Sequence, residues 1–346
     1  MQQNIQKYYL GKNVVITGGA SFIGSHLAEL LLSLDANVKI IDDLSSGNKN
    51  NISEIKNDLN FIKGDVRDES LVESEFKNTD VVFNLAAMHG GRGYIETHPV
   101  ESVNNMVLDH VVFSASCKNN VEKIVHASSA CVYPINLQSS ESERNYLSES
   151  DANFTEPGKA FSDGEYGWAK LMGELQLQAF HKQYGVTGIA SRIFTAYGER
   201  ENETHAAIAL IAKGVLKLDP YPIWGDGNQT RNFTYVKDTV YGLALSGTLK
   251  EGFESINIGS SKHNTVMELC EEIFKALDWK PNNYDFQLDK PVGVKSRASD
   301  NTKIKNLFNW EPTINLKEGV QNTVKWYLNN LDKDKLKNLE ELLLER

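Results

Sequence analysis

The chain has 346 residues, of which 40% are hydrophobic and 24% are charged. This length exceeds what a single hydrophobic core usually serves, so we expect one large domain and a smaller one that share a cleft. The formal net charge is −10, because 46 acidic residues outnumber 36 basic ones, and this balance argues against nucleic acid as a partner.

The cysteines and the first residues indicate where the protein works. Cys117, Cys131 and Cys270 are far apart and form no CxxC pair, so we predict neither a metal site nor a disulfide framework. Residues 1–11 are polar, and no run of about 18 apolar residues occurs, so we expect neither secretion nor a membrane span. Both observations favour a cytoplasmic protein with no membrane partner.

Short apolar runs alternate with helical patterns along the chain. The first run is residues 13–17 (NVVIT), and a glycine-rich turn and a helical pattern over residues 25–34 follow it. Later runs lie at 38–41, 60–62, 81–85, 124–127 and 188–193. This alternation predicts an α/β fold, a Rossmann-type doubly wound parallel sheet.

Three other segments carry a structural expectation. Residues 103–117 and 166–184 are helical patterns apolar enough to bury more than one face, and we expect them to pack on a partner subunit. Residues 136–165 are polar and glycine-containing, which predicts a long loop beside the active site that could act as a lid. Residues 333–346 predict a charged, solvated terminal helix.

The turn after the first strand predicts a cofactor site. It reads Thr17-Gly18-Gly19-Ala20-Ser21-Phe22-Ile23-Gly24, and glycine there lets the backbone approach a pyrophosphate at a helix N-terminus. Asp42 and Asp43 end the next strand about 20 residues further on, where a carboxylate can accept hydrogen bonds from the ribose hydroxyls. No arginine follows them immediately, so NAD is favoured over NADP. Asp65 and Val66, after the third strand, are placed to flank the adenine.

These patterns give a domain plan. We expect an NAD-binding Rossmann domain over residues 1–187, with a return segment at about 232–260. Residues 188–231 and 261–346 would form a smaller, C-terminal substrate-binding domain. The site is expected between the two.

A serine, a tyrosine and a lysine predict the chemistry. Tyr166 and Lys170 are four residues apart in a helical pattern and therefore share one face, and Ser129 lies at the end of a predicted strand. Oxidising a carbinol requires removal of the hydroxyl proton, for which a phenol with a pKa of about 10 is a poor base at neutral pH. Lys170 and a positive nicotinamide would lower that pKa, and Ser129 would hold the reacting oxygen.

At this point the sequence resembles the extended short-chain dehydrogenase/reductase family, specifically its NAD-dependent nucleotide-sugar epimerases and dehydratases, over nearly the whole chain. The likeness also includes Asn84-Leu85-Ala86-Ala87, Trp224-Gly225-Asp226-Gly227 with Arg231, Ile256-Asn257-Ile258-Gly259, and Arg297 followed by Asp300. It implies an enzyme that binds NAD and a nucleotide-diphosphate sugar, with Arg231 and Arg297 on the diphosphate, and that forms a homodimer. The implied cofactor residues are Gly18, Ser21, Phe22, Ile23, Gly24, Asp42, Asp65, Val66, Leu85, Ala86, Ala87, Tyr166 and Lys170. The implied substrate residues are Gly91, Arg92, Ser128, Ser129, Thr195, Arg231 and Arg297.

Within this family the chain resembles the GDP-mannose 3,5-epimerases, through residues 88–95, the Ser-Ser-Ala-Cys segment and the tail around Arg297. The family's dehydratases carry an acidic residue where this chain has residues 129–131 (SAC), so an epimerase is favoured. The resemblance implies an acid/base pair in which the cysteine falls on Cys131 and the family's lysine falls near His205, a residue that can also transfer protons. The catalytic set is then Ser129, Cys131, Tyr166, Lys170 and His205.

Alternatives and departures stay open. A UDP-sugar 4-epimerase, of the UDP-glucose or UDP-glucuronate type, would need no second acid/base pair; a 4,6-dehydratase or a non-catalytic family member is also conceivable. Ser21 replaces a glycine that is usual in the turn, Thr195 replaces an asparagine that contacts substrate, and Glu199 replaces a proline. These departures leave the pyrophosphate approach and the identity of the sugar open.

Overall fold

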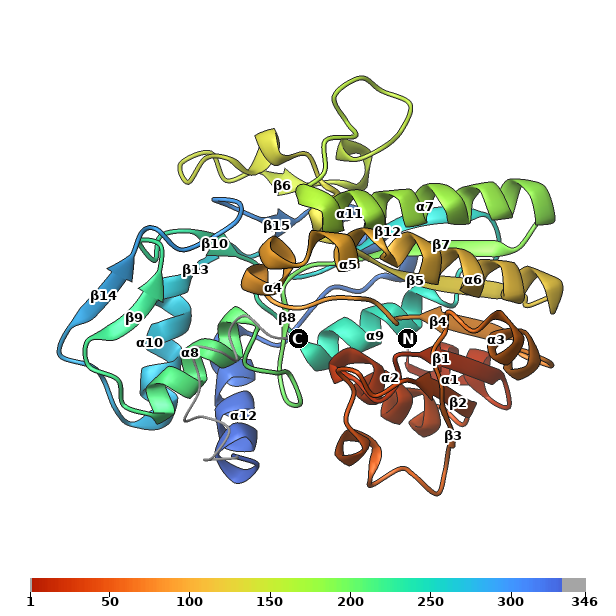
Figure 1. The fold of residues 1–346 in the computed structure, drawn as a ribbon, viewed down its shortest axis with the longest axis horizontal. Coiled ribbons are helices and arrows are strands. Elements are labelled where there is room, and N and C mark those ends of the chain that lie inside the picture. Colours follow the sequence, from red (N-terminus) through yellow and green to blue (C-terminus); the bar gives the residue numbers. More distant parts are fainter. Residues whose placement is uncertain (1, 332–346) are drawn as a thin grey trace.

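Seven parallel strands form the central sheet, in the order β12-β7-β5-β4-β1-β2-β3. The structure is a computed structural model and describes residues 2–331. All pairings within this sheet are parallel, which confirms the predicted Rossmann-type α/β fold (Figure 1). The strands are β1 (Asn13–Thr17), β2 (Asn37–Asp42), β3 (Asn60–Lys63), β4 (Val81–Asn84), β5 (Lys123–Ser129), β7 (Thr187–Ile193) and β12 (Phe253–Ile258).

Helices cover both faces of the sheet, and this explains why its strands are continuous apolar runs. Val14 and Ile16 of β1 pack in one core with residues of α2 and α9, whereas Val15 between them packs in a second core with residues of α6. In Figure 1, α6 and α7 lie side by side, and α2 and α9 lie together lower in the view. The helices of this part are α1 (Gln2–Tyr9), α2 (Phe22–Ser33), α3 (Glu69–Glu75), α4 (Arg92–Thr97), α5 (Pro99–Val103), α6 (Asn105–Lys118), α7 (Gly164–Tyr184) and α9 (Val236–Ser246).

A smaller lobe lies beside the sheet, at the left of Figure 1. Its helix α10 packs against α8 and α12, and its strand β9 pairs with β14. The remaining elements are β8 (Ala196–Tyr197), α8 (Ala206–Val215), β9 (Tyr221–Trp224), β10 (Thr230–Arg231), β11 (Thr234–Tyr235), β13 (Asn264–Thr265), α10 (Val266–Leu277), β14 (Tyr284–Gln287), β15 (Ala298–Ser299), α11 (Thr302–Phe308) and α12 (Leu316–Asn329).

One boundary of the predicted domain plan is wrong. We expected the first domain to end at residue 187, but β7 pairs with β5 on one side and with β12 on the other. The central sheet therefore extends to Ile193. The apolar run that forms β7 was visible in the sequence, but its strand partners were not.

The long segments lie where the sequence placed them. Residues 136–163 contain only β6 (Tyr146–Leu147) and short 3₁₀ turns, β6 pairs with β15, and the last two residues of the predicted loop already belong to α7. Of the two long apolar helices, the first is α6 and the second is α7. The helix predicted over residues 333–346 lies outside the described residues. In residues 2–331, no helix combines the length and the apolar character that crossing a membrane requires.

Candidate active site

A glycine turn joins β1 to α2 at the carboxyl edge of the sheet. Gly18 has a φ of +70°, and a β-carbon on it would lie 3.0 Å from the backbone nitrogen of Ala86. A β-carbon on Gly24 would overlap the carbonyl oxygen of Gly18, so the helix can pack this closely on the turn only with glycine. The turn therefore keeps open the backbone surface that a pyrophosphate needs beside the N-terminus of α2.

Ser21 fits this turn although the family usually has glycine there. Its φ of −87° and ψ of −177° are extended, which any residue can adopt. Its hydroxyl donates a hydrogen bond of 2.5 Å to the carbonyl oxygen of Gly18. The departure from the usual turn therefore causes no backbone strain.

A first cavity extends from the turn along the ends of β2 and β3. Asp42 ends β2, and its carboxylate accepts hydrogen bonds from the backbone N–H groups of Ala20 (2.9 Å) and Leu44 (2.8 Å). The predicted cofactor residues that line this cavity are Gly18, Ser21, Asp42, Asp65, Val66, Leu85, Ala86 and Ala87. The open glycine turn and the fixed carboxylate fit the adenosine half of NAD.

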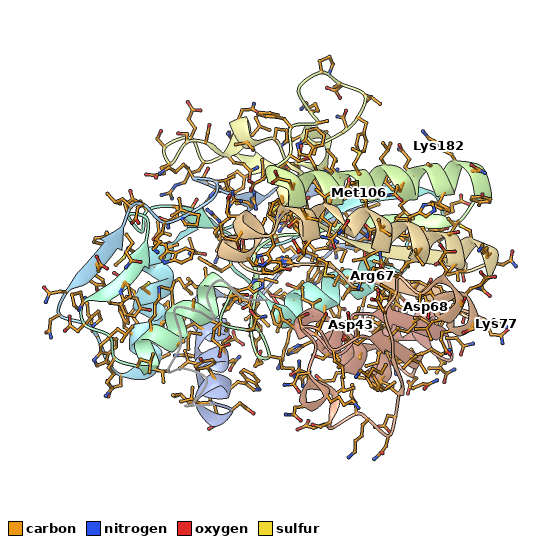
Figure 2. The ribbon with its side chains drawn as sticks, viewed as in Figure 1. Asp43, Arg67, Asp68, Lys77, Met106 and Lys182 are labelled. Atoms are coloured by element: carbon orange, nitrogen blue, oxygen red, sulfur yellow. The ribbon has the colours of Figure 1, made fainter. Side chains whose placement is uncertain are left out.

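Arg67 is a cation in this cavity that sequence reasoning missed. Its Nε donates to both carboxylate oxygens of Asp65, at 3.0 and 2.9 Å. This pairing lowers the pKa of Asp65. Asp43 and Arg67 lie at the same end of the molecule (Figure 2). Because Asp65 already balances the guanidinium, Arg67 does not overturn the expectation of NAD over NADP.

A second, larger cavity of about 450 Å³ brings the predicted catalytic and substrate residues together. The predicted catalytic residues in its wall are Ser129, Cys131, Tyr166, Lys170 and His205. The remaining predicted substrate residues in its wall are Gly91, Arg92, Ser128, Thr195, Arg231 and Arg297. The cofactor residues Phe22 and Ile23 line it too. Its position at the carboxyl ends of the strands is where α/β enzymes bind their ligands.

Tyr166 lies in the wall of this cavity. Ser129, at the end of β5, hydrogen-bonds to it, and the Nζ of Lys170 lies 5.9 Å from the centre of its ring. Burial raises the pKa of Tyr166 well above its usual value, and the Ser129 hydrogen bond only partly opposes this. The pKa of Tyr166 is therefore raised, and not lowered as we expected, because the effect of burial exceeds the effect of the Ser129 hydrogen bond.

Three arginines of the cavity wall share two carboxylates, Asp163 and Glu96, and Glu96 forms an ion pair with Arg92. Asp163 accepts hydrogen bonds from Arg92 at 3.0 Å and from Arg297 at 3.1 Å. Arg231 donates to the backbone carbonyl groups of Thr230 and Val292, and burial, with Arg297 and Arg92 nearby, lowers its pKa to about 9. Two carboxylates do not balance three guanidinium groups, so this region keeps a positive charge that a diphosphate complements.

Cys131 and His205 face the same cavity with different partners. The Nη1 of Arg297 lies 3.5 Å from the Sγ of Cys131. The Nδ1 of His205 lies 3.3 Å from the Oε1 of Glu201, and the His205 ring stacks on His89 at 5.2 Å. Burial lowers the pKa of His205 and raises that of Glu201 well above its usual value. The pair is therefore neutral, with a proton on the carboxyl group.

Gly91 fixes the position of the His205 segment. Its N–H donates a hydrogen bond of 3.3 Å to the hydroxyl of Thr204, and a β-carbon on it would overlap the carbonyl oxygen of Thr204. The resemblance placed Gly91 at the substrate. In the structure, this glycine also allows two loops to touch, so that the His205 ring lies against the loop that carries His89.

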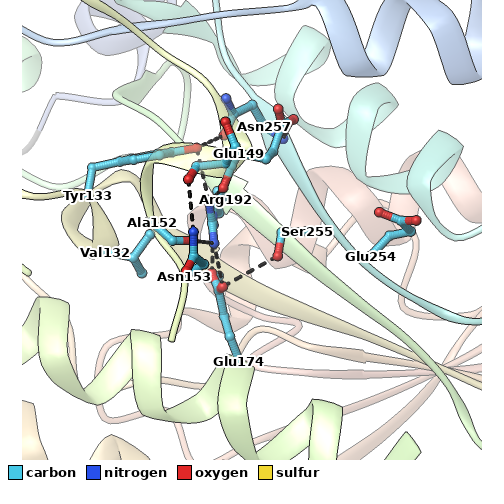
Figure 3. Close-up of polar contacts among 12 residues, drawn as sticks. Val132, Tyr133, Glu149, Ala152, Asn153, Glu174, Arg192, Glu254, Ser255 and Asn257 are labelled. Carbon is cyan, nitrogen blue, oxygen red and sulfur yellow. Dashed lines mark hydrogen bonds and ion pairs between the residues drawn. The ribbon is translucent and has the colours of Figure 1, made fainter. Parts of the chain in front are cut away.

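Ser128, which we expected at the substrate, lines the cavity and also belongs to a buried network. It donates a hydrogen bond of 2.5 Å to Glu174. Glu174 and Arg192 are each 2% exposed and form an ion pair of 2.8 Å, and Arg192 also donates to the carbonyl groups of Glu149 and Ala152 (Figure 3). This network ties the sheet and α7 to the loop beside the cavity.

Sequence reasoning missed four polar residues that line the two cavities, Arg67, His89, Asp163 and Glu201, and one buried residue that acts on Lys170, Asp109. A signal existed for two of them, because Glu201 precedes His205 by four residues and Arg67 follows Asp65 by two. The contacts of His89, Asp109 and Asp163 join segments that are far apart in the sequence, so no local pattern indicates them. Asp109 lies on α6 and acts on the buried Lys170 from there.

Comparison with known proteins agrees with this geometry. Residues 14–259 match the model of the NAD dependent epimerase/dehydratase family. The chain is 32% identical over 334 residues to GDP-mannose 3,5-epimerase 1 of Oryza sativa subsp. indica, covering 94% of this chain and 84% of that protein. It is also 32% identical over 322 residues to a putative UDP-glucose 4-epimerase of Methanocaldococcus jannaschii, covering 92% and 99% of the two chains. The UDP-glucose 4-epimerase of Thermotoga maritima, solved with UDP-glucose, superimposes with a TM-score of 0.80 at 25% identity, covering 92% of this chain and 100% of that one. The chain therefore belongs to the NAD-dependent epimerase/dehydratase family of nucleotide-sugar enzymes, whose cofactor is NAD.

Proposed function

We propose that this protein is an NAD-dependent epimerase of a nucleotide-diphosphate sugar, of the GDP-mannose 3,5-epimerase type, that works through a transient 4-keto sugar. The observation that carries the proposal is the cavity that joins two sets of groups. Tyr166 and Lys170 lie in one wall, and Cys131 and the His205–Glu201 pair lie in the same cavity. A dehydratase would need an acidic residue at 129–131, and none is there.

The first step uses the tyrosine. Tyr166 accepts the proton of the sugar 4-hydroxyl, and Ser129, which hydrogen-bonds to Tyr166, holds that oxygen in place. NAD, when bound, supplies the hydride acceptor and a positive charge beside the phenol. That charge is needed because burial alone keeps Tyr166 protonated. Arg231 and Arg297 bind the diphosphate and so set how deep the sugar reaches.

The second step inverts a carbon next to the ketone, which acidifies the neighbouring C–H bonds. Cys131, as a thiolate, takes the proton from C3 or C5 on one face. The Nε2–H of His205 then protonates that carbon on the other face, while the proton of Glu201 moves to Nδ1. The carbon keeps its valence, Cys131 ends as a thiol, and Glu201 ends as a carboxylate.

The second candidate is a UDP-sugar 4-epimerase. It is supported by the similarity to the UDP-glucose 4-epimerases of Methanocaldococcus jannaschii and Thermotoga maritima. Such an enzyme turns the 4-keto sugar over in its pocket and needs no acid/base pair. Cys131 and His205 would then be bystanders.

One experiment separates the two candidates. The protein is incubated with NAD and a panel of GDP- and UDP-sugars in D₂O, and the sugars are followed by NMR. Deuterium at C3 or C5 of a new sugar supports the 3,5-type reaction. A C4 epimer without deuterium supports the 4-epimerase, and no turnover across the panel contradicts both and supports a non-catalytic family member.

We also propose that the protein is a cytoplasmic homodimer that pairs through α6 and α7. Val107 of α6 is 52% exposed, and Trp168 and Leu175 of α7 are 39% and 38% exposed. Large apolar side chains of neighbouring helices are expected to be covered by a partner. The three cysteines are free thiols, as a reducing compartment requires. Light scattering that shows a monomer at micromolar concentration would contradict the dimer.

A further inference from the structure

A column of buried polar side chains lies behind the active-site lysine, on the side away from the sugar cavity. Thr17 of β1 donates a hydrogen bond of 2.9 Å to Asn84 of β4, and Asn84 donates one of 2.8 Å to the Oδ1 of Asp109 on α6. The Nδ1 of His126, on β5, lies 3.5 Å from the same Oδ1. Asp109 is 1% exposed and His126 is 0% exposed. Four elements of the fold therefore contribute to one buried cluster.

Helix α7 comes close to this cluster through a glycine. A β-carbon on Gly173 would lie 2.5 Å from the Oδ2 of Asp109 and 2.9 Å from the Nε2 of His126. Both of these buried atoms have no hydrogen-bond partner in the described part of the chain. Lys170 lies one helical turn before Gly173, on the same face of α7. The glycine lets the lysine-bearing helix approach the carboxylate.

The cluster lies close to the buried ammonium group of Lys170, and the carboxylate of Asp109 is its anion. Lys170 is 2% exposed, and a buried ammonium is unstable without an anion near it. Asp109 is the carboxylate that acts on Lys170 and raises its pKa against the lowering caused by burial. His126 does not compete as a cation, because burial and Lys170 hold its pKa well below its usual value. The groups that interact with Asp109 are thus Asn84, neutral His126, Lys170 and Tyr166.

We propose that Asp109 is a positioning residue of the active site: it is the buried counter-ion that keeps Lys170 protonated beside Tyr166, and Asn84 holds its carboxylate in place. This inference rests on the proposed roles of Tyr166 and Lys170, but it does not depend on which carbon is epimerised. It gives function to a buried acid that would otherwise only destabilise the fold.

The proposal predicts a direction for the pH dependence. Turnover needs Tyr166 without its proton and Lys170 with its proton, so activity rises and then falls with pH. Without the carboxylate of Asp109, Lys170 loses its proton at a lower pH. The negative charge of Asp109 also raises the pKa of Tyr166, so its removal lets the phenol ionise at a lower pH. Both limbs of the profile should therefore move to lower pH in the variant.

The test is the pH profile of kcat for Asp109→Asn, measured on the full-length protein with NAD and the nucleotide sugar that it converts. We expect both limbs to shift down by about one unit or more, as a nearby opposite charge typically shifts a pKa by 1 to 3 units. Asp109→Ser is the second variant, in case the first does not fold. The matched control is Asp238→Asn, because Asp238 is also a buried carboxylate, 6% exposed, but binds the backbone N–H groups of Thr313 and Ile314 elsewhere.

Two results would overturn the proposal. One is a lower kcat in Asp109→Asn with both limbs of its pH profile at the wild-type pH, and the other is an equal shift of both limbs in Asp238→Asn. A readout independent of turnover keeps it separate from the proposed function. Acetic anhydride labels only the neutral amine, so the pH dependence of Lys170 acetylation, followed by peptide mass spectrometry, reports its protonation directly. A shift of this labelling to lower pH in Asp109→Asn supports the counter-ion even if the panel of sugars shows no turnover. Labelling that is unchanged overturns it even if the enzyme is active.

Discussion

Replacing Asp109 by asparagine should stabilise the protein at neutral pH. Burial raises the pKa of Asp109 from 3.8 to about 6, although Lys170 and the Asn84 hydrogen bond oppose this shift. A carboxyl whose pKa is higher in the folded state than in the unfolded state contributes stability below the unfolded value and loses it as the pH rises through the folded value. The shift is about two units, and one unit corresponds to about 1.4 kcal/mol. The folded wild type should therefore be about 3 kcal/mol less stable at pH 7 than with a neutral group at this position.

Asparagine is the suitable test because it keeps the shape of the side chain and an acceptor oxygen for Asn84. We expect Asp109→Asn to need more urea for unfolding than the wild type at pH 7, with the difference shrinking as the pH falls from about 6 toward 4. If Lys170 loses its proton in the variant, the stabilising effect only grows, because a buried charge disappears. A variant that is less stable than the wild type at pH 7, or a difference that does not depend on pH, would refute this reasoning.

Three further predictions test the site and the network behind it. Cys131→Ala should abolish deuterium incorporation at C3 or C5, and His205→Gln should abolish inversion there, while in both variants the sugar still reduces NAD, seen at 340 nm; unchanged incorporation in the first and unchanged inversion in the second would remove the pair from the mechanism. Arg231→Gln should raise KM for the nucleotide sugar about ten- to a hundredfold, because a hydrogen bond to a charged group contributes about 1.5–3 kcal/mol; an unchanged KM would place the diphosphate elsewhere. Arg192→Met should cost about 3–5 kcal/mol in urea unfolding, because it leaves the Glu174 carboxylate buried without its ion pair, and adding Glu174→Leu should restore much of the loss; a small single-variant effect would contradict this.

The fold was predictable because each strand carries its own signal. The apolar run of residues 13–17 is β1 itself, and the glycine turn, Asp42 and the later runs follow in the order that a doubly wound sheet requires. The wrong boundary at residue 187 has a physical reason. The residues of β7 form one continuous apolar run, but β7 joins the sheet by pairing with β5 and β12, each more than 50 residues away. Pairing at that distance leaves no pattern in either segment alone.

Site residues could be predicted from the sequence only where they lie at a spacing typical of a known motif. Tyr166 and Lys170 are neighbours on one helix face, and such pairs can be found from sequence. Asp163 could not be assigned, because its role comes from Arg92 and Arg297, which lie on segments 71 and 134 residues away. The pKa of Tyr166 was expected to fall, but burial dominates it, and burial depends on the whole fold.

The two candidate functions share the cofactor turn, the tyrosine, the lysine and the diphosphate arginines, so none of these can separate them. The difference lies in the wall formed by His89, Cys131, Glu201 and His205. A 4-epimerase would gain nothing from a buried Glu201 whose proton reaches the cavity through His205, and burying that carboxyl group has a cost in stability. Glu201→Gln distinguishes the roles, because glutamine can hydrogen-bond to Nδ1 but cannot give up a proton to it. We expect this variant to oxidise the sugar at C4 as before and to lose inversion at C3 or C5 by about a hundredfold, the range of general acid catalysis. Full inversion in Glu201→Gln would show that His205 acts without this carboxyl group.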